Sequence, residues 1–216
     1  MTFEQVYDIL QQDVNYEKLL KPILKYLDKE KLTLDAGCGS GYILSMLASK
    51  GYLIEGLDNN QEMLDLAKQR LEELNLNVLL INHDLRKPLP KKYDQIISLL
   101  DVTHYFMGVK NLFKIYFNAL TAGGTLILDL YKSPVNEEES GIYDDLKYTW
   151  KVRTTVSQII HKIDVEYLDE TYNFRVRQFY KPLNIYLETI KEIGFKVKTI
   201  QSFDDRKVFV ICQKEK

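Results

Sequence analysis

A run of alternating glycines constrains this chain more than any other feature. Gly37, Gly39 and Gly41 separate residues 32–36, which read as a strand, from a segment with helical spacing. Glycine lets the backbone turn sharply and bring its N–H groups against a ligand, because any side chain there would block the close approach. A helix that begins behind such a turn adds the positive end of its dipole. The pattern therefore predicts a strand, a ligand-binding turn and a helix.

A carboxylate follows the turn at a distance typical of nucleoside-binding α/β folds. Asp58 ends the second predicted strand, about 20 residues after the glycines. In such folds an acid at this point hydrogen-bonds the hydroxyl groups of a ribose. Asp58 is therefore a candidate ribose ligand.

The glycine spacing separates two cofactor classes. The dinucleotide fingerprint is Gly-x-Gly-x-x-Gly, because its third glycine allows close helix-to-strand packing beneath a pyrophosphate. Here the third glycine comes one residue early, and Tyr42 stands where the fingerprint has Gly or Ala. Residues 34–41, Leu-Asp-Ala-Gly-Cys-Gly-Ser-Gly, instead resemble motif I of the class I S-adenosylmethionine-dependent methyltransferases. An NAD-type oxidoreductase is the alternative that this spacing disfavours.

The resemblance implies a set of residues around the methyl donor S-adenosylmethionine. Asp35 is the acid that precedes the glycines in that family, and we expect it to accept hydrogen bonds from the loop or from the donor's ammonium group. Asp84 and Leu85 stand where the family reads adenine, and a turn or cap role is the alternative for Asp84 that the upstream glycine motif disfavours. The residues implied for the cofactor are Tyr16, Asp35, Gly37, Cys38, Gly39, Asp58, Asn59, Asp84, Leu85, Leu100 and Asp101.

A second resemblance concerns the segment after the fourth predicted strand. Residues 99–105, Leu-Leu-Asp-Val-Thr-His-Tyr, resemble methyltransferases that carry an inserted β-sheet cap, in which a backbone carbonyl near Leu100 meets the amino-acid end of the donor. In such enzymes N-terminal helices cover the donor, so Tyr16 would face the sulfonium, a contact worth about 0.5 to 2 kcal/mol; packing of its helix onto the core is the alternative. His104 is a candidate general base because histidine titrates near neutrality, and a structural role is its alternative.

Composition bounds the class of protein. The chain has 216 residues, 45% of them hydrophobic, and a net charge of -2, so it offers no general attraction to nucleic acid. Its start lacks a basic region followed by an apolar run, and no segment reaches the roughly 20 apolar residues of a membrane span. Its two cysteines have no Cys or His at metal-ligand spacing, so we expect a cytoplasmic protein with no metal site.

Strand patterns that alternate with helical ones predict a Rossmann-like, doubly wound α/β fold, and a terminal hairpin completes a seven-stranded sheet with an antiparallel last strand. Helical spacing also predicts an N-terminal helix over residues 19–27. Residues 133–182 break the pattern with an acidic stretch, 137–139, and three alternating runs. We expect this segment to be a small inserted antiparallel sheet that covers the acceptor site, with a mobile acidic entry, whereas residues 1–132 and 183–216 form the donor-binding core. The alternative is a dimerisation or packing element, which would give a homodimer.

These observations predict a methyltransferase that acts by in-line transfer on a small or medium-sized acceptor, at nitrogen or oxygen. The donor is already activated, so positioning and exclusion of water can supply much of the acceleration. Residues 101–104 lack the Asn/Asp-Pro-Pro-aromatic sequence often found in enzymes that methylate nucleic-acid bases. A protein that binds S-adenosylmethionine without catalysis is the remaining alternative.

Overall fold

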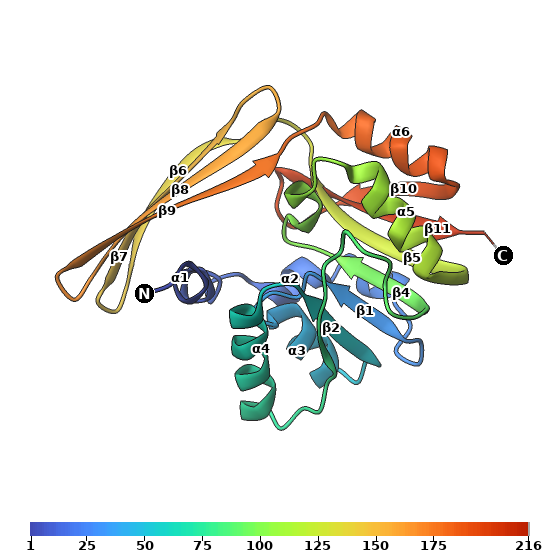
Figure 1. Cartoon of the computed structure of the whole chain (residues 1–216), viewed down its shortest axis with the longest axis horizontal. Helices are drawn as coiled ribbons and strands as arrows, with labels where there is room; N and C mark the ends of the chain where they lie inside the picture. The colour runs from blue at the N-terminus through green and yellow to red at the C-terminus, as the bar shows by residue number, and fades with distance from the viewer. Residues whose placement is uncertain (216) are drawn as a thin grey trace.

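The computed structural model describes residues 1–215 and divides its strands between two sheets (Figure 1). The larger sheet has seven strands in the order β10-β11-β5-β4-β1-β2-β3. Its strands are β1 (Thr33–Ala36), β2 (Ile54–Asp58), β3 (Leu80–Asn82), β4 (Tyr93–Ser98), β5 (Leu120–Tyr131), β10 (Phe195–Gln201) and β11 (Lys207–Lys214). The smaller sheet contains β6 (Asn136–Tyr143), β7 (Leu146–Thr154), β8 (Gln158–Tyr167) and β9 (Glu170–Phe179).

The larger sheet is parallel except at one end. β1 pairs in parallel with β2 and β4, β2 with β3, and β4 with β5. β11 runs antiparallel to both β5 and β10. The predicted Rossmann-like sheet with an antiparallel last strand is therefore confirmed, and the first residue of β11 comes to the edge at which the parallel strands end.

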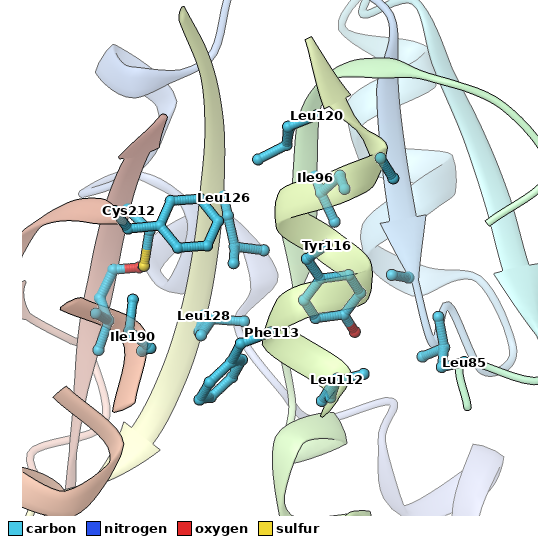
Figure 2. Close-up of a cluster of buried hydrophobic side chains, with 14 of the residues drawn as sticks. Leu85, Ile96, Leu112, Phe113, Tyr116, Leu120, Leu126, Leu128, Ile190 and Cys212 are labelled. Carbon is cyan, nitrogen blue, oxygen red and sulfur yellow. The ribbon is translucent and has the colours of Figure 1, made fainter. Parts of the chain in front are cut away.

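Helices cover both faces of this sheet (Figure 1). Their bounds are α1 (Phe3–Leu10), α2 (Tyr16–Leu20), α3 (Tyr42–Ser49), α4 (Gln61–Glu73), α5 (Val109–Ala119) and α6 (Leu183–Ile193), with 3-10 turns η1 (Leu24–Tyr26) and η2 (Val102–Tyr105). On one face Phe113 and Tyr116 of α5 and Ile190 of α6 pack against Leu126 and Leu128 of β5 (Figure 2). Helices α2, α3 and α4 supply the core of the other face. All of these helices are too short to cross a membrane, as far as residues 1–215 are concerned.

The helix expected over residues 19–27 is wrong in extent. α2 ends at Leu20, and the next helical turn is the separate η1. Pro22 lies between them, and proline has no N–H to donate to a helix and clashes with the preceding turn. The apolar residues of this stretch, Leu19, Leu20 and Ile23, are nevertheless buried in the core.

The smaller sheet is an antiparallel meander inserted between β5 and α6 (Figure 1). It has four strands, because the acidic stretch 137–139 belongs to β6 and pairs with residues 150–152 of β7. The acidic entry is therefore an edge strand of the smaller sheet, and its mobility stays a prediction. Val6 and Leu10 of α1 pack against Ile163 and Val165 of β8, so α1 connects the inserted sheet with the core.

Candidate active site

Two cavities open beside the carboxyl ends of the parallel strands. The first has a volume of about 430 Å³ and the second about 550 Å³. Leu99, Leu100 and Tyr105 line both, as do residues of α1, so the cavities meet at the end of β4. The first lies over the glycine loop, and the second lies between the larger sheet and the inserted one.

The glycine loop has backbone angles that few other residues adopt. Gly37 and Gly39 have φ values of +86° and +52°. A Cβ on Gly37 would lie 2.6 Å from a methyl group of Val102, whereas a Cβ on Gly39 would meet no atom within 4 Å. Gly37 is thus needed for packing against η2, and Gly39 borders open space in the first cavity.

Asp58 is tied to this loop. Its Oδ2 accepts from the N–H of Gly39 at 2.9 Å, and its Oδ1 accepts from the N–H of Asn60 at 2.9 Å. Burial raises the pKa of Asp58, and these backbone donors oppose the rise. Each oxygen keeps a further lone pair, so the carboxylate can still accept from two hydroxyl groups in the cavity.

Asp35 has a buried carboxyl group, and one of its oxygens accepts no hydrogen bond from residues 1–215. It is 2% exposed and borders the first cavity, and its Oδ2 has no hydrogen-bond partner within residues 1–215. Burial raises its pKa to about 8, and the charge of Asp58 adds to that rise. A buried oxygen without a partner costs free energy, so a cationic donor at this point would satisfy it.

Asp84 and Leu85 also border the first cavity. Asp84 Oδ1 accepts from the backbone N–H and from Nε of Arg86, both at 2.9 Å. The hydrogen bond from the Arg86 side chain lowers the pKa of Asp84. Asp84 therefore stabilises a turn, as the alternative to a ligand role predicted. It also borders the first cavity, where a ligand contact is predicted.

Leu100 and Asp101 form a strained link after β4. Their φ values are 58° and 71°, a left-handed conformation that non-glycine residues rarely adopt and that clusters at functional sites. Leu100 borders both cavities, but Asp101 borders only the second. Its carboxylate lies 2.7 Å from Nζ of Lys207 and accepts from the hydroxyl of Tyr131 at 3.0 Å. The side chain of Asp101 thus borders the second cavity, and a contact of its backbone with the cofactor stays a prediction.

Tyr16 both packs and borders the first cavity. Its ring stacks on Tyr42 with centroids 5.0 Å apart, and its hydroxyl donates to Gln11. The guanidinium of Arg70 lies 3.5 Å from the centroid of Tyr42 and pairs with Asp8 of α1 at 2.7 Å. This stack fastens α1 and α2 over the glycine loop. The remaining predicted residues, Cys38 and Asn59, also border the first cavity.

His104 does not border either cavity. It is fully buried, and Nδ1 lies 3.0 Å from the carbonyl oxygen of Phe179. Its ring packs between Tyr131 and Tyr186. Its role as a general base stays a prediction that no contact in the structure supports.

The sequence prediction missed Lys207 and His161, which both border the second cavity. Lys207 is 6% exposed, and Nζ bridges Asp101 and Asp129 at 2.7 and 3.0 Å. Burial opposes its charge, but the two carboxylates hold the pKa of Lys207 well above its usual value. An available signal was its position, because the first residue of an antiparallel strand lies where its parallel neighbours end.

The glycine turn, Asp58 and the Rossmann-like sheet define a nucleoside-binding α/β protein. Comparisons with known proteins show which family of such proteins this chain resembles. Residues 33–124 match the family described as Methyltransferase domain. A Bacillus subtilis (strain 168) protein named "Putative methyltransferase YqeM" is 27% identical over 219 residues, which cover 92% of this chain and 87% of that protein.

Solved structures share the fold over the whole chain. One is an S-adenosylmethionine-dependent methyltransferase from Clostridium acetobutylicum ATCC 824, with a TM-score of 0.82 at 20% identity. The match covers 99% of this chain and 98% of that protein. Streptomyces venezuelae DesVI has a TM-score of 0.81 at 17% identity, and the match covers 100% of this chain and 99% of DesVI. Residues 33–124 thus match a methyltransferase domain, and the whole chain shares its fold with class I S-adenosylmethionine-dependent methyltransferases. The chain is a methyltransferase, and the Clostridium acetobutylicum enzyme of the same fold depends on the cofactor S-adenosylmethionine; no comparison supports an NAD-type oxidoreductase or a non-catalytic binding protein.

The first cavity fits this cofactor. The unpartnered oxygen of Asp35 suits the ammonium group, and the open space beside Gly39 suits a ligand that lies against the loop. The free lone pairs of Asp58 suit a ribose diol.

Proposed function

We propose that this enzyme transfers the methyl group of S-adenosylmethionine to an amine of a small or medium-sized acceptor in the second cavity. The observation that carries the proposal is the charge of that cavity. Six carboxylates border it against two cations, and the set is Asp13, Asp101, Asp129, Glu137, Glu139 and Asp204 with Lys207 and Arg206. Such an excess attracts an ammonium-bearing molecule and disfavours an anionic one.

Aromatic rings support the same class of acceptor. Those that border the second cavity are Phe3, Tyr7, Tyr105, Tyr131, Tyr143, Tyr148, Trp150, Phe203 and Phe209. Ring faces attract cations, by about 0.5 to 2 kcal/mol each, and aromatic walls exclude water. Two structural neighbours have titles of the same kind: CalS10 is an amino pentose methyltransferase and KedS8 is a sugar N-methyltransferase, both with TM-scores of 0.76.

On this proposal the donor occupies the first cavity. Asp58 accepts from the ribose hydroxyls, and Asp84 and the N–H of Leu85 bind the adenine edge. Asp35 and the carbonyl of Leu100 hold the amino-acid end, and the ring of Tyr16 lies near the sulfonium. When bound, S-adenosylmethionine supplies a methyl group on a positively charged sulfur. The residues of the chain bring the acceptor nitrogen in line with it and exclude water. The acceptor reacts as the free amine, so the proton of its ammonium form passes to a carboxylate that borders the second cavity. The nitrogen lone pair then forms the new bond to carbon as the carbon–sulfur bond breaks and S-adenosylhomocysteine leaves.

The segment 133–182 acts in this proposal as a cap on the acceptor. Arg206, in the turn before β11, pairs with Glu137 of β6 and with Asp204, so the two sheets are fastened across the mouth of the second cavity. Asn60 donates to Glu4 of α1 at 2.6 Å, which fastens α1 beside the donor loop. A homodimer and a cytoplasmic location stay predictions.

The test is transfer from methyl-labelled donor to matched panels of acceptors. Amino sugars and aliphatic amines form one panel, and the corresponding alcohols form the other. We expect labelled N-methyl products from the first panel alone. Products from the alcohols alone would contradict the amine assignment while leaving the donor assignment intact.

A further inference from the structure

Three polar side chains form a hydrogen-bonded chain on one face of the inserted sheet. Nε1 of Trp150 on β7 lies 3.1 Å from Nδ1 of His161 on β8, and Nε2 of His161 lies 3.0 Å from Oε1 of Gln178 on β9. The strand register explains the contacts: Trp150 pairs with Ile163 and His161 with Val176, so each hydrogen bond joins diagonal neighbours on the same face. All three residues border the second cavity.

The chemistry of the indole fixes the direction of this chain. An indole N–H can only donate, so Nδ1 of His161 must accept and carries no proton. The neutral ring then carries its proton on Nε2 and donates it to Oε1 of Gln178. The Gln178 amide nitrogen is therefore left to donate elsewhere. Burial lowers the pKa of His161 below its ordinary value of 6.5, which agrees with a neutral ring.

Tyr105 borders both cavities, and Gln178 borders the second cavity with it. Tyr105 ends η2, which follows the strained link at Leu100 and Asp101, and β9, the strand that carries Gln178, contacts η2. The side chain of Tyr105 thus lies where the two cavities meet, beside the strand at which the hydrogen-bonded chain ends. A tyrosine hydroxyl that accepts from the Gln178 amide nitrogen keeps its second lone pair and its proton for a ligand.

We propose that the hydroxyl of Tyr105 contacts the acceptor amine at the methyl-transfer point, and that Trp150, His161 and Gln178 are positioning residues that orient it. The inference rests on the proposed function, because it presumes a donor in the first cavity and an amine in the second. The inserted sheet then does more than cover the acceptor. It sets the direction of one hydrogen bond at the reacting nitrogen.

One experiment tests the direction of the chain without any acceptor. Long-range ¹H–¹⁵N NMR of the full chain distinguishes the protonation state of each of its three histidines. We expect His161 to be neutral at pH 7 with its proton on Nε2. In Trp150→Phe we expect the Nδ1-protonated form to appear and the pKa of His161 to rise, because Nδ1 no longer accepts from the indole. A charged His161 at pH 7, or a proton on Nδ1 in the unaltered protein, would overturn the proposal.

A second experiment tests the contact at Tyr105 with a defined probe. Sinefungin resembles the donor but carries an amine on carbon where the donor carries a methyl group on sulfur, so its ammonium lies at the methyl-transfer point. Calorimetry compares its Kd with that of S-adenosylhomocysteine, which lacks that group. We expect Tyr105→Phe and Gln178→Leu to weaken sinefungin about tenfold or more relative to S-adenosylhomocysteine. We expect Val152→Ala, which alters an apolar wall of the same cavity, to leave the ratio unchanged.

The two proposals fail in different ways. Failure of both ligands to bind the unaltered chain contradicts the donor site itself. Binding of both with the same ratio in Tyr105→Phe as in the unaltered chain overturns the role of Tyr105 alone. If Val152→Ala changed the ratio of the two Kd values as much as Tyr105→Phe does, the effect would be a general disturbance of the cavity. That result would also overturn the role of Tyr105.

Discussion

The backbone N–H of Gly39 donates to the carboxylate of Asp58 across 2.9 Å, so the turn after β1 is tied to the end of β2. The same carboxylate accepts from Asn60 at the start of α4. One side chain therefore sets the shape of the donor loop and offers lone pairs to the cavity. The role of Asp58 is structural as well as ligand-binding.

Asp58→Ala should weaken binding of S-adenosylmethionine by about 2 kcal/mol, roughly thirtyfold in Kd, because charge-assisted hydrogen bonds to the ribose are lost and the loop is released. Calorimetry measures the change. Asp65→Ala removes the same charge from the exposed face of α4 and should have little effect. Equal Kd values for the two variants would contradict the role of Asp58.

Asp35 should make the free protein less stable as pH rises. Its pKa is raised from 3.8 to about 8 in the folded state, so between about pH 4 and pH 8 the folded chain binds more protons than the unfolded one. The free energy of unfolding therefore falls across that range. Urea titrations at several pH values should show a shallower fall in Asp35→Asn. The same slope in both proteins would show that Asp35 ionises normally.

Donor binding should release a proton from Asp35 near pH 7, because an ammonium group beside it favours the carboxylate. Calorimetry in buffers of different ionisation enthalpy counts the protons released. We expect release in the unaltered protein and less in Asp35→Asn. Proton uptake on binding would contradict an ammonium contact.

Asp84→Ala should weaken binding of the adenosyl ligand more than binding of its inosine analogue, because the analogue lacks the exocyclic amine that Asp84 is proposed to bind. Arg86→Ala serves as a control because it removes the ion pair with Asp84 and keeps the carboxylate. The Kd values for the adenosyl ligand and for its inosine analogue, measured in each variant, distinguish a ligand role of Asp84 from a turn role. Equal losses for both ligands in Asp84→Ala would leave Asp84 with its turn role only.

Lys207→Met should destabilise the protein by about 3 to 5 kcal/mol, because it leaves Asp101 and Asp129 buried without their cation. Chemical denaturation measures the loss. Adding Asp129→Asn to the same chain should restore part of the stability, since one buried charge is then removed. No recovery in the double variant would argue against a charge effect.

Local patterns gave much of the fold and of the donor site. The glycine turn and Asp58 are predictable because backbone conformation and strand ends depend on neighbouring residues. The break at Pro22 was also visible in the sequence, but apolar spacing across it favoured one continuous helix. The acidic residues 137–139 were not recognised as a strand, because an exposed strand lacks the apolar alternation of a half-buried one.

The second cavity could not be predicted in the same way. Lys207 and Asp101 are far apart in the chain and meet only because β11 inserts beside β5. His161 borders the cavity because of the register of three strands. Such contacts depend on long-range packing, which a single sequence does not display. His104 stands close to the expected site in sequence, yet its ring turns into the core.

The most direct test is a calorimetric titration of the full chain with S-adenosylmethionine, S-adenosylhomocysteine and NAD. We expect one molecule of either adenosyl ligand to bind per chain and no measurable binding of NAD. Binding of NAD without binding of either adenosyl ligand would contradict the assignment of the first cavity to S-adenosylmethionine.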